Sequence, residues 1–143
     1  MKKGVDHIGI TASYLAHNGS RRYVMTKRGQ NCRDEQGTWD FGGGSIEMGD
    51  TVEETIIKEI KEELDADVLE MNFLGYRDMF REMNGEKTHW IALQFLVHVN
   101  AMQVKNNEPH KFDDVQWFTL DNLPNPLHSS ALQILEKFKT KIP

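Results

Sequence analysis

The chain has 143 residues, of which 38% are hydrophobic, and its 22 acidic and 17 basic side chains give a formal net charge of −5. This length and composition are typical of a single folded domain over residues 1–143 and exclude a disordered chain. No apolar run approaches the roughly 20 residues that a membrane-spanning helix needs, so we expect no membrane contact. Basic runs never exceed two residues, which argues against a groove for a nucleic acid polymer.

The cysteine content predicts the cellular compartment. Cys32 is the single cysteine, so a disulfide within the chain is excluded and a reducing compartment is expected. Asp6 and His7 interrupt the first residues, which therefore lack the apolar core of a signal peptide. We expect a cytoplasmic protein that acts as a monomer or homodimer.

Alternation of apolar and polar residues predicts three strands in the first third of the chain, over residues 6–16, 21–28 and 39–41. A turn at residues 17–20 and a polar loop over residues 29–38 separate them. Three consecutive glycines, Gly42, Gly43 and Gly44, are expected to end the third strand.

A helix is predicted over residues 51–64, with Thr51 or Asp50 as its N-cap and Glu54 or Glu53 as the capping-box partner. The remaining pattern predicts strands over residues 68–83, 88–99 and 115–120, and a final amphipathic helix over residues 127–141. The segment NGEK predicts a hairpin turn between the first two of these strands, and Gly75 predicts an irregularity in the first. Many strands with two separated helices indicate an α/β fold in which both faces of a mixed sheet are covered.

Acidic residues are concentrated in one segment. Between Glu47 and Glu70 there are ten acids against two lysines, Lys58 and Lys61. Such a cluster either faces water or binds cations.

The helical periodicity predicts where these acids lie around the helix. At about 100° per residue, one helix face is apolar and consists of Ile56, Ile57, Ile60 and Leu64. Glu59, Glu62 and Glu63 fall in a wedge beside that face, where like charges repel. A divalent cation would relieve this repulsion, and ligands that are all oxygen favour Mg²⁺, Mn²⁺ or Ca²⁺ over zinc. The alternative is a solvated helix face with no ligand, but the glycine-rich loop before the helix makes that alternative weaker.

The segment FGGGSIEMGD, followed by KEIKEEL, resembles the signature of the Nudix hydrolases, G-x5-E-x7-R-E-U-x-E-E-x-G-U, in which U is a bulky aliphatic residue. Gly44 matches the first glycine, and the three helix glutamates all match. Four positions differ from the family pattern: Asp50 replaces a glutamate, Lys58 an arginine, Asp65 the final glycine, and Gly42 stands where many members have proline.

The resemblance implies a three-layer α/β/α sandwich with a mixed sheet, in which the signature forms a loop, a helix and a second loop. It also implies hydrolysis of the pyrophosphate bond in a nucleoside diphosphate linked to a group X, with Mg²⁺ or Mn²⁺ as the cofactor and a small nucleotide as the substrate.

The resemblance further assigns roles to residues. It implies that Glu59 and Glu63 bind the metal, that Glu62 binds it directly or through a water molecule, and that the carbonyl oxygen of Gly43 is a further ligand. Glu59 and Glu62 are the candidate catalytic residues, with Glu59 as the candidate general base. A further acid from outside the signature is expected to complete the site, and the candidates are Glu108, Asp113 and Asp114.

The same stretch is similar to that of MutT-like members, which cleave nucleoside triphosphates. This similarity implies that Phe41 lies near the base, Arg28 near the entrance, and Gly44 beside the substrate. Phe41 is equally well explained as a core residue, and Arg28 as a solvated strand end. ADP-ribose, nucleotide sugars and dinucleoside polyphosphates remain alternative substrates, and a non-catalytic Nudix-fold nucleotide-binding module is the alternative of another class.

Overall fold

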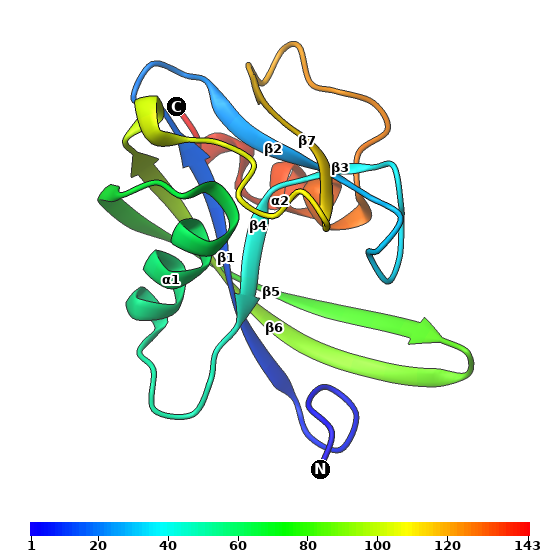
Figure 1. Ribbon diagram of the computed structural model, residues 1–143. Helices are drawn as coiled ribbons and strands as arrows, with labels where there is room; N and C mark the ends of the chain where they lie inside the picture. Colours follow the sequence, from blue (N-terminus) through cyan, green and yellow to red (C-terminus); the bar gives the residue numbers. More distant parts are fainter.

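The computed structural model describes every residue of the chain except the side chain of Met83. Within this described part, a seven-stranded mixed sheet has the order β3-β2-β1-β6-β5, with β4 paired to β1 and β7 paired to β2 (Figure 1). The strands are β1 (Gly9–His17), β2 (Tyr23–Arg28), β3 (Trp39–Asp40), β4 (Gly42–Ser45), β5 (Val68–Met83), β6 (Glu86–Val99) and β7 (Phe112–Phe118). The pairing of β1 with β6 is parallel and the other pairings are antiparallel.

Two helices cover the two faces of this sheet (Figure 1). Helix α1 (Val52–Leu64) buries Ile56, Ile60 and Leu64 against strand residues that include Ala12 and Tyr14 of β1. Helix α2 (Ser129–Phe138) packs Ala131, Ile134 and Phe138 on the opposite face. Short 3-10 helices, η1 (Ala101–Gln103) and η2 (Lys139–Lys141), complete the regular structure described. The expected three-layer α/β/α fold is therefore confirmed.

The β5–β6 hairpin is much longer than the other antiparallel pairs and extends beyond the two helices (Figure 1). Its turn contains Asn84 and Gly85, both with positive φ, as the NG pair predicts. The expected irregularity at Gly75 is also present, because the register of β5 against β6 shifts between Phe73 and Gly75. The face of the hairpin that carries Met79, Arg81 and Trp90 becomes one wall of a cavity.

Several sequence predictions about the sheet are wrong in detail. Strand β1 begins at Gly9 and not at residue 6, β2 at Tyr23 and not at residue 21, and β6 at Glu86 and not at residue 88. The glycines do not end the strand: after Phe41 the chain continues as β4, in which Gly42, Gly43 and Gly44 pair with β1. Glycine has a low strand propensity when considered alone, but here the ladder to β1 and the packing of α1 determine the conformation. Strand β7 also begins at Phe112 and ends at Phe118, three residues before its predicted start and two before its predicted end.

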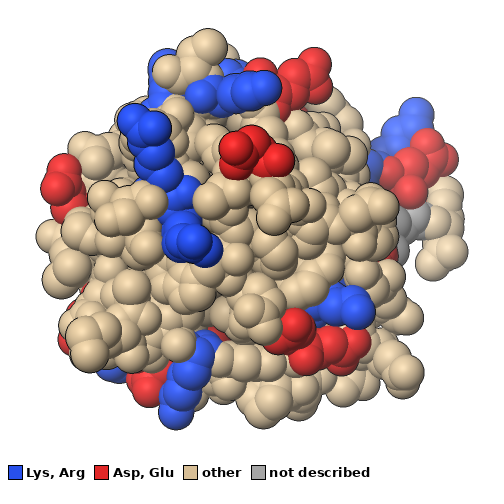
Figure 2. All heavy atoms as spheres, turned by 90° about the horizontal axis from the view of Figure 1, so that it is seen from above, with Lys and Arg blue, Asp and Glu red and all other residues tan. Residues whose placement is uncertain are grey.

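Charged side chains of both signs are scattered among uncharged residues on the face drawn in Figure 2, so this side of the molecule carries no surface of a single sign. Among the helices described, none is long and apolar enough to cross a membrane.

Candidate active site

Helix α1 is held in place by both of its ends. Thr51 caps the N-terminus by accepting a hydrogen bond from the Glu54 amide at 3.1 Å, as the capping pattern predicts. At the C-terminus Asp65 adopts the left-handed conformation with φ 55°, and its amide donates to the Lys61 carbonyl. Aspartate thus takes the left-handed cap position where the signature has glycine. Between these caps, Glu59 and Glu63 lie one turn apart on the side of α1 that faces β4.

Glu63 is buried, with only 3% of its surface exposed. Its Oε1 accepts a hydrogen bond from the Tyr14 hydroxyl at 2.9 Å and from the Gly43 amide at 3.4 Å, while Lys111 Nζ lies 3.5 Å from Oε2. Burial raises the pKa of Glu63 to about 7, against the opposing effects of Lys111 and the Tyr14 hydrogen bond. Protein groups therefore compensate only part of the cost of burying this charge.

Glu59 is half-buried and lies against the backbone of β4. A Cβ built on Gly44 would come within 2.3 Å of the Glu59 carboxyl carbon, so only glycine leaves room for this carboxylate. Burial, followed by the negative charges of Glu63 and Glu62, raises the pKa of Glu59 to about 7. Glu62 is exposed on the outer side of the same cluster.

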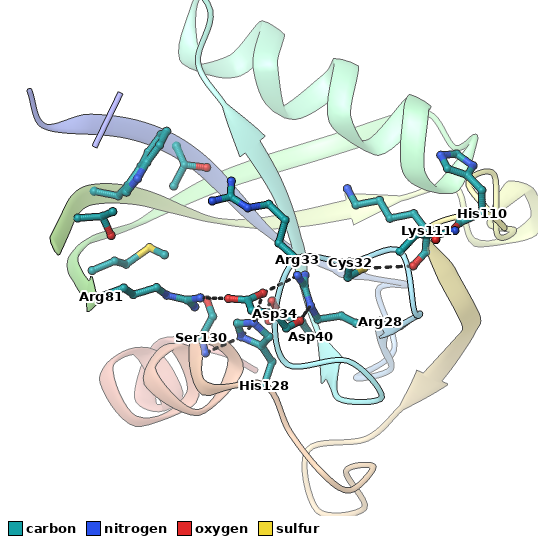
Figure 3. A pocket seen from close by; sticks show the side chains of 15 residues that line it. Arg28, Cys32, Arg33, Asp34, Asp40, Arg81, His110, Lys111, His128 and Ser130 are labelled. Atoms are coloured by element: carbon teal, nitrogen blue, oxygen red, sulfur yellow. Dashed lines mark hydrogen bonds and ion pairs between the residues drawn. The ribbon is translucent and has the colours of Figure 1, made fainter. Parts of the chain in front are cut away.

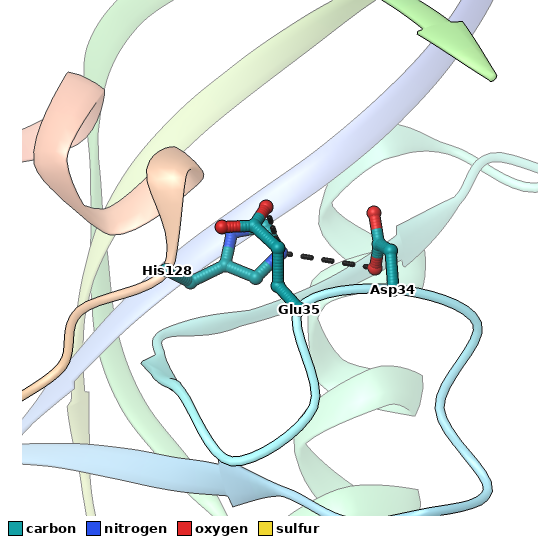
Figure 4. Close-up of side chains that lie close together, drawn as sticks. All are labelled: Asp34, Glu35 and His128. Carbon is teal, nitrogen blue, oxygen red and sulfur yellow. Dashed lines mark ion pairs between the residues drawn. The ribbon is translucent and has the colours of Figure 1, made fainter.

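The three helix glutamates are neighbours, but they do not converge on one point. Among the described residues, a group of three acid or histidine side chains with ligand atoms within 4.8 Å of one another occurs at Asp34, Glu35 and His128 (Figure 4). Glu59, Glu62 and Glu63 form no such group in the same part of the chain. Repulsion between the carboxylates, together with the hydrogen bonds that hold Glu63 to β1 and β4, explains their separation.

The Asp34–Glu35–His128 group is an ion-pair network and not a second acidic site. Asp34 pairs with Arg28 at 2.7 Å and with Arg81, and Glu35 Oε2 lies 3.0 Å from His128 Nε2. Although burial acts in the opposite direction, Arg28 and Arg81 hold the pKa of Asp34 below its usual value. Because both arginines already neutralise these acids, the network has little attraction left for a cation.

Of the three acids considered outside the signature, Glu108 is the one whose charge is among the largest causes that raise the pKa values of Glu59 and Glu63. The loop that carries it is tethered to the end of α1, because the Asn107 amide donates to the Glu63 carbonyl at 3.1 Å. Asp114 instead accepts hydrogen bonds from the Val115 amide and from Gln116, and Asp113 lies beside Gly29. The structure therefore brings Glu108, and not the other two, to the acidic cluster.

A cavity of about 630 Å³ lies beside this cluster, between the loop after β2, the β5–β6 hairpin and the start of α2 (Figure 3). A smaller hollow of about 150 Å³ adjoins it and reaches Gly43 and Glu63. The two share six lining residues, Thr11, Arg28, Asp40, Met79, Lys111 and Ser130. The size of the larger cavity lies within the range of ligand pockets.

The predicted substrate residues occupy different places around this cavity. Phe41 is buried at 5% exposure and lines the smaller hollow. The structure is therefore compatible with Phe41 as a core residue and with Phe41 as a contact to the nucleotide base. Arg28 lines both hollows, but its guanidinium is held by Asp34. Gly44 borders Glu59.

The sequence interpretation missed several cavity residues, among them Asp40, Lys111, His128 and Ser130. Burial raises the pKa of Asp40 to about 7, even though Arg28, Arg77 and Arg81 are near enough to lower it. The signal for Asp40 was a lone acid between Trp39 and Phe41. In a strand such a residue faces away from both apolar neighbours, so it must face either solvent or a polar cavity.

Comparison with known proteins agrees with this geometry. The NUDIX domain family model matches residues 7–138. An ADP-ribose pyrophosphatase of Methanocaldococcus jannaschii is 33% identical over 72% of this chain and 57% of its own length. The nucleoside triphosphatase NudI of an Enterobacter species is 30% identical over 80% of this chain and 83% of its own length. A MutT NUDIX hydrolase structure from Burkholderia pseudomallei superposes with a TM-score of 0.80 at 28% identity, covering 91% of this chain and 97% of that one.

The chain belongs to the Nudix family, as its signature indicates. It spans 57% of the length of the Methanocaldococcus relative and 29% of an NAD-capped RNA hydrolase NudC from Pseudomonas aeruginosa.

Nudix hydrolases generally use a divalent metal, and the residues present fit one. The donors are carboxylates on α1, two of them with raised pKa values, and the carboxyl group of Glu59 takes the space that a Cβ on Gly44 would fill. Oxygen donors of this kind suit a hard divalent cation.

Proposed function

We propose that residues 1–143 form a single Nudix domain that uses a divalent cation, Mg²⁺ or Mn²⁺, to hydrolyse the pyrophosphate bond in a nucleoside diphosphate linked to a group X. The observation that carries this proposal is the placement of Glu59 and Glu63 against the Gly43–Gly44 backbone. Glu63 and Gly43 line a hollow that adjoins a cavity of about 630 Å³, and Glu59 lies one helical turn from Glu63. A carboxylate pair beside a nucleotide-sized cavity would hold a divalent cation, which would neutralise charge on a diphosphate.

The residues of the site take separate roles in this proposal. Glu59, Glu63 and the Gly43 carbonyl hold the cation, with Glu62 and Glu108 on the outer side. When bound, the cation supplies charge neutralisation on the diphosphate and activation of the attacking water. Glu59, whose carboxyl group lies beside Gly44, is the proposed general base, because a carboxylate beside the attacking water can take its proton.

The other cavity residues serve binding. Lys111 lies beside Glu63 and lines both hollows, where its ammonium can contact phosphate oxygens. Phe41 offers an apolar contact to a base, and Gly44 borders the substrate. Arg28 contributes positive charge at the entrance while Asp34 fixes its orientation.

A nucleoside triphosphate is the proposed substrate. The Enterobacter relative that supports it carries the name nucleoside triphosphatase and is matched over 83% of its length. The alternative is ADP-ribose or a nucleotide sugar. The Methanocaldococcus relative, at 33% identity, carries the name ADP-ribose pyrophosphatase, which favours the first of these. We expect a small nucleotide and not a nucleic acid polymer, in a cytoplasmic protein whose cysteine, Cys32, is free.

The test is a screen with Mg²⁺ or Mn²⁺ over nucleoside triphosphates, ADP-ribose, nucleotide sugars and dinucleoside polyphosphates, in which the nucleotide products are separated and identified by chromatography. Glu63→Gln should lose at least 10²-fold in kcat while its thermal unfolding stays close to wild type, because removing an essential acid–base or charge-stabilising group costs this much. Glu53→Gln, on the exposed side of the same helix, is the matched control and should stay active. Absence of wild-type turnover on every nucleotide, combined with measurable nucleotide binding, would instead support a non-catalytic binding module.

A further inference from the structure

Tyr14 is a buried tyrosine whose hydroxyl group contacts the acidic cluster. It lies in β1, only 2% of its surface is exposed, and its ring packs in the core beneath α1. Its hydroxyl donates a hydrogen bond of 2.9 Å to Glu63 Oε1. A phenol keeps its proton at neutral pH, so this contact is a neutral donor to a carboxylate and not an ion pair.

The glycine opposite Tyr14 is necessary for this arrangement. Tyr14 and Gly42 are direct partners in the β1–β4 ladder. A Cβ built on Gly42 would lie 2.2 Å from both the Cζ and the hydroxyl oxygen of Tyr14. Any side chain at position 42 would therefore push the ring aside. The departure from the family pattern at Gly42, where many members have proline, thus has a structural reason in this chain.

Together these contacts fix one end of the Glu63 carboxylate. Oε1 accepts from both Tyr14 and the Gly43 amide, which hold it toward the sheet. Oε2 faces Lys111 at the longer distance of 3.5 Å, on the side of the hollow. The carboxylate is consequently oriented with Oε1 anchored by two donors, while Oε2 lies near Lys111, a residue that lines the hollow.

We propose that Tyr14 is a positioning residue that orients the Glu63 carboxylate for the divalent cation, and that Gly42 leaves the space for the Tyr14 ring. This inference rests on the proposed function, since it concerns the same site. Hydrogen-bond partners of metal-ligating carboxylates typically contribute 10–100-fold to metal affinity or activity. Tyr14 acts through Glu63 and need not touch the substrate.

The experiment is direct measurement of Mn²⁺ binding, by electron paramagnetic resonance of free Mn²⁺ or by calorimetry, to wild type and Tyr14→Phe. The variant keeps the ring and loses only the hydroxyl. We expect roughly 10-fold weaker Mn²⁺ binding and a matching rise in the Mn²⁺ concentration that gives half-maximal turnover. Raising the Mn²⁺ concentration should restore most of kcat.

Tyr23→Phe is the matched control, because Tyr23 is also buried and its hydroxyl donates to the Pro143 carbonyl, far from the cluster. It should bind Mn²⁺ like wild type. Gly42→Ala provides a second route to the same result, since it displaces the ring without altering Tyr14, and it should also weaken Mn²⁺ binding.

Wild-type affinity in both Tyr14→Phe and Gly42→Ala would overturn the positioning role and leave Tyr14 as a packing residue, while the proposed function stands. Wild type that binds no Mn²⁺ and hydrolyses no nucleotide would overturn the proposed function itself, and the positioning role with it.

Discussion

Gly44 and the carboxyl group of Glu59 lie in direct contact across the interface between β4 and α1. A Cβ added to Gly44 would come within 2.3 Å of both the carboxyl carbon and Oε1 of Glu59. The glycine therefore does more than permit a turn. It lets the carboxylate of α1 approach the β4 backbone, beside the Gly43 amide that contacts Glu63.

This contact predicts the effect of Gly44→Ala. The added methyl group should push the Glu59 carboxylate away from β4 by about an ångström, and misplacement on this scale can cost 10²-fold in rate. We expect a drop of roughly that size in kcat with little change in the unfolding temperature. Ser45→Ala in the same strand is the control and should retain activity. Unchanged kcat in Gly44→Ala would mean that the position of Glu59 is not critical.

Local patterns in the sequence were sufficient to predict α1 and its acids. The cap at Thr51, the apolar face of Ile56 and Ile60, and the spacing of the glutamates all act within a few residues of one another. The same local reasoning failed for the triple glycine. Its strand conformation comes from pairing with β1, about 30 residues earlier in the chain, and single-residue propensity carries no information about such a partner.

The rest of the site depends on contacts between distant parts of the chain. Tyr14 reaches Glu63, and Glu35 reaches Ser129 and His128, because the sheet brings their strands and loops together. No periodicity encodes which acid of a late loop turns toward α1, so the sequence leaves the choice among Glu108, Asp113 and Asp114 open, and the position of Glu108 favours it.

That choice leads to a second prediction. Glu108→Gln should weaken activation by Mg²⁺ several-fold, because its charge acts on both Glu59 and Glu63. Asp113→Asn and Asp114→Asn remove the same charge from the neighbouring strand and should leave Mg²⁺ activation nearly unchanged. The measurement is the Mg²⁺ concentration that gives half-maximal turnover. Equal effects from all three variants would point to a general loss of negative charge and not to a specific position.

Asp34 allows a third prediction, on stability. Its side chain is 22% exposed and pairs with both Arg28 and Arg81. Asp34→Ala would leave these two cations without their shared partner, so we expect a loss of about 2 kcal/mol in the free energy of unfolding, between the values for exposed and buried pairs.

The loss should depend on pH in a defined direction. Because the pKa of Asp34 is lowered in the folded state, its contribution is present above the unfolded pKa of 3.8 and is lost as the pH falls through the folded pKa. Urea unfolding of wild type and Asp34→Ala should therefore differ at pH 7 and converge in strong acid. Asp121→Ala, at an exposed position, should show no such gap. A gap that is constant with pH would contradict the ion-pair explanation.

Asp40 should show the opposite pH dependence, because burial raises its pKa from 3.8 to about 7. Between these values the folded chain retains a proton that the unfolded chain releases, so the free energy of unfolding falls as the pH rises. Asp40→Asn has no such titrating proton. Its Oδ1 can still accept a hydrogen bond from the Phe41 amide, as the Oδ1 of Asp40 does at 2.8 Å. Relative to wild type, the variant should gain on the order of 2 kcal/mol between pH 5 and pH 8, at 1.36 kcal/mol per unit of pKa shift. Urea unfolding at the two pH values measures this gain. If the difference between variant and wild type were the same at both, Asp40 would be ionised throughout, and its carboxylate would be stabilised by the surrounding arginines more strongly than its burial destabilises it.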